Sequence, residues 1–178
     1  MNKNKKNLLC RLCSSSQLVS VLELASTPPA NAFISKENLE FSQKKYPLEL
    51  SFCEKCSHLQ LTEVINPNEL FDHYVYVSGT SPVFVEHFAS YANSVVETYK
   101  PSTKNYVLDI GSNDGTLLKF FKRLGYRTIG VDPAIEISKK AQEDGIETIN
   151  EFFNWETSEK IKTKYSLASL ITANNVFA

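Results

Sequence analysis

The four cysteines of the 178-residue sequence form two C-x-x-C pairs, Cys10 with Cys13 and Cys53 with Cys56. Such a pair places two thiolates on one side of a tight turn, and two turns of this kind complete a tetrahedral metal site. Zinc suits four thiolates because the resulting site is closed, redox-silent and structural. We therefore predict that these four cysteines are zinc ligands.

Other roles for the cysteines stay open at the level of sequence. Two disulfides are disfavoured in a cytoplasmic protein, whereas an iron site of the rubredoxin type would use the same ligands. A redox pair of the thioredoxin type is disfavoured because neither pair opens a helix within a βαβ unit. His58 follows Cys56 by two residues and is an alternative ligand, which four cysteines make unnecessary.

A second group of residues with chemical meaning lies between Val107 and Leu118. The apolar run 106–110 predicts a buried parallel strand, and apolar residues at helical spacing follow it. Between them, Gly111 and Gly115 bracket a polar turn. Glycine lets backbone approach a ligand, and free N–H groups at a helix start favour electron-rich atoms. The segment is therefore predicted to bind a nucleotide-like cofactor.

The glycine spacing distinguishes two classes of cofactor. A dinucleotide fingerprint needs G-x-G-x-x-G, but this sequence has Asn113 and Thr116 at the second and third glycine positions. The spacing Asp109-x-Gly111-x-x-x-Gly115 is similar to motif I of class I S-adenosylmethionine-dependent methyltransferases, whose cofactor has no pyrophosphate.

An acidic residue is expected about 20 positions further on, at the end of the next strand, where it accepts hydrogen bonds from ribose hydroxyls. The run 127–131 predicts that strand, and Asp132 with Pro133 follows it. An acid at this place makes the glycine pair a more specific signal than the pair alone.

Composition limits the partners and the location of the protein. The net charge of -1 gives no general attraction to nucleic acid or to an anionic membrane. Lys3, Lys5 and Lys6 make the N-terminus basic, but no apolar stretch of the kind that a signal peptide or a membrane span needs follows them. We therefore expect a cytoplasmic protein.

The elements that position these residues follow from hydrophobic spacing. Residues 1–67 are predicted to form a zinc-binding module of short strands, for which metal supplies much of the folding free energy. Residues 68–100 form a helical connector, with Ser81 as the N-cap of a helix over 82–99. Residues 101–178 alternate strands and helices, which is typical of an α/β domain.

The α/β region is predicted to be a parallel, doubly wound sheet that binds ligands at the carboxyl ends of its strands. Phe152 or Phe153 follows one such end and can stack on adenine or pack in the core. The predicted strands are 106–110, 127–131, 146–149 and 167–172, and the predicted helices are 116–124, 135–144 and 156–164. The candidate cofactor-binding residues are Asp109, Gly111, Ser112, Asn113, Gly115, Asp132, Pro133, Phe153, Asn174 and Asn175.

The ordered motifs resemble one family, the zinc-domain-bearing S-adenosylmethionine-dependent C-methyltransferases that act on nucleotide-linked 4-keto-deoxysugars. The resemblance covers nearly all of the chain and rests on both cysteine pairs, Tyr74-Val-Tyr76-Val-Ser78, the glycine turn, Gly130-Val-Asp-Pro133 and Asn174-Asn-Val-Phe-Ala178. It implies S-adenosylmethionine and Zn²⁺ as cofactors and a sugar nucleotide as substrate. It also implies that Tyr76 is the catalytic candidate and that Asp132 holds the ribose.

The resemblance further implies sequence beyond Ala178, because the family's Asn-Val-Phe-Ala stretch is usually followed by a histidine, more strands and a C-terminal domain. The family's catalytic His, Tyr and Glu groups would lie there. We therefore expect an N-terminal fragment with an incomplete Rossmann-like sheet, which binds cofactor without reliable turnover. Its last strand would be an unpaired apolar edge, which predicts self-association.

Three functions compete at this level. The first is methyl transfer to a carbon beside a ketone, where a general base forms an enolate that attacks the methyl group. The second is a zinc-stabilised, non-catalytic binding module, which predicts no affinity for S-adenosylmethionine. The third, an NAD(P) oxidoreductase, is disfavoured by Asn113.

Overall fold

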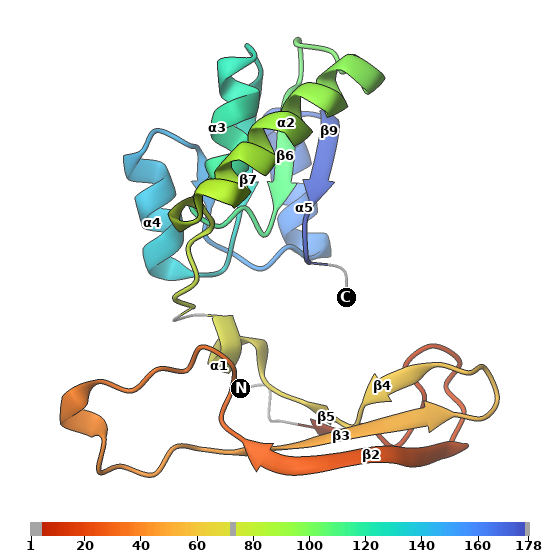
Figure 1. Cartoon of the computed structure of the whole chain (residues 1–178). Helices are drawn as coiled ribbons and strands as arrows, with labels where there is room; N and C mark the ends of the chain where they lie inside the picture. The colour runs from red at the N-terminus through yellow and green to blue at the C-terminus, as the bar shows by residue number, and fades with distance from the viewer. Residues whose placement is uncertain (1–4, 72–73, 177–178) are drawn as a thin grey trace. The chain divides into compact units, whose positions relative to one another are not determined.

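The computed structural model describes residues 5–71 and 74–176, which belong to two compact units, Met1–Phe71 and Asp72–Ala178 (Figure 1). The first unit ends at Phe71 rather than at 67 because the short helix α1 (Pro67–Phe71) belongs to it. Glu69 on α1 accepts a hydrogen bond from the Tyr46 hydroxyl and pairs with Lys44 Nζ at 2.7 Å.

The first unit consists of two small antiparallel sheets. β2 (Leu18–Thr27), β3 (Tyr46–Cys53) and β4 (Leu59–Leu61) form one sheet in that order, and β1 (Lys5–Lys6) pairs with β5 (Glu63–Val64). β2 ends just before two consecutive prolines, which have no N–H to donate. The short strands predicted for the zinc-binding module are therefore confirmed.

One face of the three-stranded sheet is apolar, and the described residues of the first unit do not bury it. Side chains at paired positions share a face, and the register pairs Val19 with Phe52, Leu22 with Leu50, Leu24 with Leu48, Leu50 with Leu61 and Phe52 with Leu59. None of the eight side chains of this apolar face is buried. The opposite face carries polar pairs such as Ser51 and Gln60, which are buried.

The second unit contains a four-stranded parallel sheet. Its strands are β6 (Tyr106–Ile110), β7 (Arg127–Val131), β8 (Thr148–Ile149) and β9 (Ala168–Ala173), in the order β8-β7-β6-β9. The order therefore reverses between β6 and β9, which places a topological switch point at their carboxyl ends. The predicted parallel α/β sheet is confirmed.

Helices cover both faces of this sheet (Figure 1). On one face, α2 (Pro82–Tyr99), α3 (Thr116–Arg123) and α4 (Ile135–Glu143) pack around buried Val107, Leu118 and Phe121. On the other face, α5 (Trp155–Tyr165) packs on a cluster that includes Leu108, Ile129 and Ile161. Successive side chains of β6, such as Val107 and Leu108, therefore point to opposite faces of the sheet and belong to the two clusters of the hydrophobic core.

Helix ends follow local sequence signals. The Ser81 side chain caps α2 by accepting a hydrogen bond from Phe84 N at 3.4 Å, and Asn154 caps α5 in the same way. The strand predicted over 146–149 is shorter, because Ile146 N–H donates to the carbonyl of Ala141 and continues the end of α4. No helix within 5–71 or 74–176 has the length and apolar character needed to cross a bilayer.

Candidate functional site

The four cysteine sulfurs converge in the first unit. Their Sγ atoms lie within 4.8 Å of one another, with 3.6 Å between Cys10 and Cys56 and 3.6 Å between Cys13 and Cys53. Zn–S bonds of about 2.3 Å place the sulfurs of a tetrahedral site about 3.8 Å apart. The geometry therefore fits one zinc ion held by Cys10, Cys13, Cys53 and Cys56.

The two cysteine turns have the same backbone design. In the first, Cys10 N–H donates to Ser15 O, and Ser14 N–H donates to Cys10 O. In the second, Cys53 N–H donates to His58 O, and Ser57 N–H donates to Cys53 O. Ser14 and Ser57, which follow the second cysteine of each pair, have φ of 59° and 61°. Each turn therefore presents two sulfurs to the same point.

This geometry excludes two of the alternatives for the cysteines, the two disulfides and the redox pair of the thioredoxin type. A disulfide requires a sulfur–sulfur distance of about 2.0 Å, and all four cysteines are free. Neither pair opens a helix, since the second begins at the last residue of β3 and the first precedes β2. Among the described residues, the metal-ligand group contains the four cysteines and not His58.

The thiols also differ in acidity. Burial acts to raise the pKa of Cys10, but the backbone N–H groups of Cys13 and Leu12 outweigh it and lower this pKa to about 6. The backbone of His58 acts to lower the pKa of Cys56, yet burial and the three neighbouring cysteines raise it to about 12. Four crowded sulfurs therefore resist complete ionisation, and a bound divalent cation would stabilise all four thiolates.

The glycine turn of the second unit follows β6, as predicted. Gly111 and Gly115 have φ of 69° and 71°, the left-handed region that favours glycine. A Cβ on Gly111 would lie 2.6 Å from Val176 Cγ2, so this glycine makes room for a neighbouring side chain of the same chain. A Cβ on Gly115 would crowd Ile146 at 3.1 Å.

Three N–H groups at the start of the turn donate hydrogen bonds within the protein. Gly111 and Ser112 donate to the carbonyl of Val131 at 2.8 and 3.2 Å. Asn113 N–H donates to Asp132 Oδ2 at 2.8 Å. The hydroxyl of Ser112 is buried without a hydrogen-bond partner in the described part of the chain and lies over Gly130.

Asp132 lies at the end of β7 beside this turn. Its Oδ2 accepts from Asn113 N–H, and its Oδ1 accepts from Ala134 N–H at 2.9 Å. Burial raises the pKa of Asp132, and these two backbone donors act against that shift. Its carbonyl accepts from Asn150 Nδ2 at 2.9 Å. The carboxylate is therefore fixed next to the turn, and the next residue, Pro133, is half-buried.

Asp109 lies inside the unit rather than at the carboxyl edge of its sheet. It is buried within β6 and accepts a hydrogen bond from Thr172 Oγ1 on β9 at 2.7 Å. Burial raises the pKa of Asp109 to about 7, with the Thr172 hydroxyl acting against this shift and the charge of Asp132 adding to it. Its role is to join the two strands at the switch point.

The remaining candidates lie at the ends of β8 and β9. Phe153 packs against the core cluster beneath α5, which favours core packing over stacking on a ligand. Asn174 Nδ2 is buried without a hydrogen-bond partner among the described residues. Asn175 is exposed and has φ of 56°. Phe177 and Ala178 of the Asn174–Ala178 motif lie outside the described residues.

Tyr76 lies in the segment that precedes α2. Its side chain is 40% exposed, and its ring centroid lies 6.4 Å from that of Tyr74. The Tyr76 carbonyl accepts a hydrogen bond from Asn113 Nδ2 at 2.9 Å. The structure thus brings Tyr76, the glycine turn and Asp132 together, while Asp109 and Phe153 face the interior.

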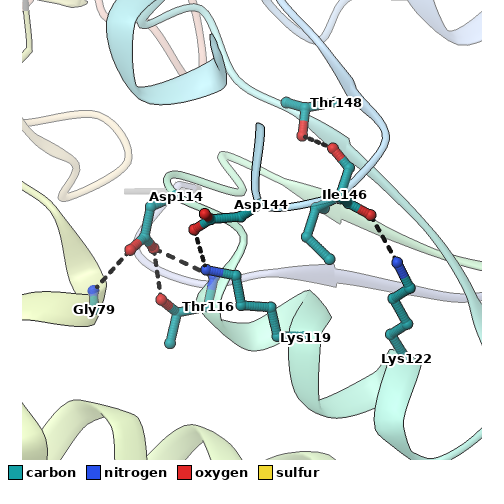
Figure 2. Close-up of polar contacts among 9 residues, drawn as sticks. Gly79, Asp114, Thr116, Lys119, Lys122, Asp144, Ile146 and Thr148 are labelled. Atoms are coloured by element: carbon teal, nitrogen blue, oxygen red, sulfur yellow. Dashed lines mark hydrogen bonds and ion pairs between the residues drawn. The ribbon is translucent and has the colours of Figure 1, made fainter. Parts of the chain in front are cut away.

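The sequence analysis did not identify the contacts that Asp114 of the turn makes with Gly79 and Thr116. Asp114 is buried, and its Oδ2 accepts from Gly79 N–H at 3.2 Å (Figure 2). Its Oδ1 accepts from the hydroxyl of Thr116 at 2.7 Å and from its N–H at 3.2 Å. An Asp two residues before a helix start is a known local signal for this last bond, whereas the contact with Gly79 has no local signal.

Comparisons with known proteins agree with this division of the chain. Residues 10–71 match a family model described as a zinc binding domain, and residues 84–178 match a family model described as a methyltransferase domain. The C-methyltransferase NovU of Streptomyces niveus is 32% identical over 169 residues, which is 95% of this chain and 40% of that protein. The chain thus spans about two fifths of the length of this relative.

The second family match covers more than half of the chain. The four converging sulfurs lie within the first match, and the parallel sheet with its glycine turn lies within the second. Each unit therefore has the structural feature that the description of its matching family leads one to expect. The chain belongs to the S-adenosylmethionine-dependent methyltransferases that carry a zinc-binding domain before the methyltransferase domain.

Proposed function

We propose that the chain binds S-adenosylmethionine at the carboxyl edge of β6, β7 and β9 and takes part in C-methylation. The acceptor that we propose is a carbon beside the ketone of a nucleotide-linked deoxysugar. The observation that carries the proposal is the 32% identity to a C-methyltransferase across 95% of this chain. The sugar-nucleotide substrate rests on the family resemblance of the ordered motifs.

The proposed cofactor contacts begin with Asp132. Each of its carboxylate oxygens accepts one backbone N–H, so lone pairs on both oxygens stay available for ribose hydroxyls. The buried Nδ2 of Asn174 has no hydrogen-bond partner within 5–71 and 74–176, which supports a polar ligand group at the end of β9, since buried donors are normally satisfied. Gly111 and Gly115 shape the turn between these two groups.

The bound cofactor supplies an electrophilic methyl group on a positively charged sulfur. We assign Tyr76 to substrate contact because its side chain is 40% exposed while its carbonyl is held by the turn. Its hydroxyl can donate to the ketone oxygen, and so stabilise the negative charge that develops when the neighbouring carbon loses a proton. Removing this hydroxyl in Tyr76→Phe should weaken binding of a keto-sugar nucleotide about fivefold in calorimetry, through loss of one hydrogen bond.

Calorimetry with S-adenosylhomocysteine and with NAD tests the cofactor. We expect binding of S-adenosylhomocysteine, no binding of NAD, and at least about tenfold weaker binding for Asp132→Ala, from loss of charge-assisted hydrogen bonds. Asp144→Ala, which removes a more exposed carboxylate of the same unit, is the matched control. Equal affinity of wild type and Asp132→Ala would reject this cofactor site, and absence of any binding would favour the non-catalytic zinc-stabilised module.

We also propose self-association through β9. Within the described residues this strand pairs with β6 alone, so its other edge offers unpaired backbone groups. Ile171 on this strand is 58% exposed. Sedimentation velocity should show oligomers that Ile171→Lys shifts towards monomer, and a wild-type monomer at micromolar concentration would contradict this proposal.

A further inference from the structure

The segment before α2 is attached to the glycine turn by side chains of the turn itself. The amide of Asn113 makes two hydrogen bonds to it. Its Nδ2 donates to the carbonyl of Tyr76 at 2.9 Å, and its Oδ1 accepts from Ser78 N–H at 2.9 Å. A side-chain amide has the same donor and acceptor as a peptide group, so Asn113 pairs with residues 76 and 78 as a neighbouring strand would.

Asp114 makes the next attachment along the same segment. Its Oδ2 accepts from Gly79 N–H, and its Oδ1 is held by Thr116 at the start of α3 (Figure 2). A Cβ on Gly79 would lie 2.5 Å from Asp114 Oδ2 and 2.8 Å from Thr116 Oγ1. The segment therefore lies so close to the turn that any residue larger than glycine at position 79 would clash with it.

Asn113 also contacts the carboxylate assigned to the cofactor. Its backbone N–H donates to Asp132 Oδ2 at 2.8 Å, while its side chain holds the segment of Tyr76. Its φ of 51° lies in the left-handed region, where Asn is among the few non-glycine residues that are common. One residue thus joins the cofactor side and the substrate side of the site.

We propose that Asn113 and Asp114 are positioning residues that fix the Tyr76–Gly79 segment on the cofactor turn, and that cofactor binding and the order of this segment are coupled through Asn113. The coupling rests on the proposed function, whereas the attachment does not. If the two are coupled, bound cofactor must slow hydrogen exchange in the Tyr76–Gly79 segment. By thermodynamic linkage, a more mobile segment must in turn weaken cofactor binding by the same factor.

Hydrogen exchange measured by mass spectrometry tests the attachment without any ligand. Asn113→Gly removes both side-chain hydrogen bonds and keeps the left-handed backbone unstrained. We expect the Ser78 amide to exchange about tenfold faster, while amides of β6 keep their wild-type rates. Asn113→Asp keeps the acceptor for Ser78 N–H, so this amide should stay protected, and Asp114→Asn should affect Gly79 more than Ser78.

Asn31→Gly is the matched control, because Asn31 also has a left-handed φ, of 61°, and lies in the other unit. It should leave exchange over 74–81 unchanged. Wild-type exchange at Ser78 in Asn113→Gly would overturn the attachment. Faster exchange throughout β6 would also overturn it, since the residue would then support the whole unit rather than this segment.

Exchange with and without S-adenosylhomocysteine tests the coupling. We expect ligand to slow exchange at Ser78 in the wild type and to have no such effect in Asn113→Gly, which should bind the ligand several-fold more weakly. Calorimetric binding with unchanged Ser78 exchange would overturn the coupling and leave the proposed function intact. Absence of binding would instead reject the proposed function, and the ligand-free comparison would still decide the attachment.

Discussion

The two units differ in what is buried and what is exposed. In the first unit, as far as it is described, the buried residues are Cys10, Tyr46, Ser51, Cys53, Gln60 and Thr62. Its apolar face, from Val19 to Leu61, consists of side chains that the described residues of this unit leave exposed or half-buried. In the second unit, two clusters of large apolar side chains are buried on both faces of the parallel sheet.

This difference indicates which interaction stabilises each unit. Apolar burial is the dominant favourable term in folding, and the second unit has it in both clusters. The first unit, with few buried apolar groups, depends on a cross-link that the unfolded chain lacks. Zinc bound to four thiolates is such a cross-link, so metal should stabilise the first unit and leave the second almost unaffected.

Metal removal is expected to have the largest effect. In Cys53→Ser, or after chelation, hydrogen exchange over 5–71 should become that of an unfolded chain, because structural zinc contributes about 10–16 kcal/mol and a domain has only about 5–15 kcal/mol in total. Amides of β6 and β7 should keep their protection. Elemental analysis should show one zinc per wild-type chain and none in the variant.

Ser16→Ala, at an exposed serine near the first cysteine turn, is the control and should keep both zinc and protection. Protection over 5–71 that survives metal removal would break the comparison between the units. The first unit would then have a source of stability beyond the metal.

Removal of a core side chain in the second unit should have the converse effect. Phe121 is fully buried in the cluster beneath α2 and α3. Phe121→Ala should lower the unfolding free energy of this unit by about 3–5 kcal/mol, with unchanged zinc content. Chemical denaturation measures the loss, and Tyr99→Ala, at a side chain that is 72% exposed, should cost far less.

Much of the fold follows from local sequence signals. The helix Pro82–Tyr99 was predictable because Ser81 and Pro82 mark its start, and the strands of the parallel sheet were predictable from apolar runs. The shortening of β8 was not predictable, since it depends on a hydrogen bond between Ile146 and the end of α4. Hydrophobic spacing also does not reveal what covers a sheet face, as the first unit demonstrates.

The candidate site was predictable only in part. Parallel topology alone brings Gly111 and Asp132 to one edge of the sheet. The contacts of Asn113 with Tyr76 and Ser78 join residues 37 and 35 positions apart, so no local pattern indicates them. The inward position of Asp109 depends on its pairing with Thr172 on a strand far along the chain.

The unfolding free energy of the second unit should also depend on pH, because Asp109 is buried in it. The pKa of Asp109 is about 7 in the folded unit, against 3.8 for an ordinary Asp carboxyl. A raised folded-state pKa means that stability is full below the unfolded pKa and is lost as pH rises through the folded one. The unfolding free energy should therefore fall by about 4 kcal/mol between about pH 4 and pH 7 from this group.

Asp109→Asn should remove this part of the pH dependence, so the variant should gain stability relative to the wild type as pH rises. The groups facing Asp109 are Thr172, Asp132 and Tyr91, whose phenol pKa is raised by burial and by the charge of Asp109. Denaturation curves from pH 4 to 8 measure the slope. A wild-type slope in the variant would contradict the prediction.

Asp144→Asn supplies a control of opposite sign. The hydrogen bond and the charge of Lys119 lower the pKa of Asp144, and the pair lies 2.7 Å apart on the surface (Figure 2). The contribution of Asp144 is present above its unfolded pKa and is lost as pH falls through the folded one. The variant should therefore lose stability relative to the wild type as pH rises, if only slightly.

Substitution on the apolar face should have the smallest effect on stability. Leu24 on β2 is 49% exposed, so Leu24→Lys should change the unfolding free energy of the zinc-loaded first unit by at most about 0.5 kcal/mol. Ser26→Lys, at an exposed position of the same strand outside the apolar face, is the matched control. Chemical denaturation with excess zinc measures both variants.

A loss above about 2 kcal/mol for Leu24→Lys alone would mean that this side chain is buried in solution, since only buried apolar positions give losses of that size. Concentration dependence of the loss would then identify the cover as a second copy of the chain, because association stabilises by mass action. With no such loss, metal alone holds a unit whose apolar side chains face outward, and the contrast with the second unit stands.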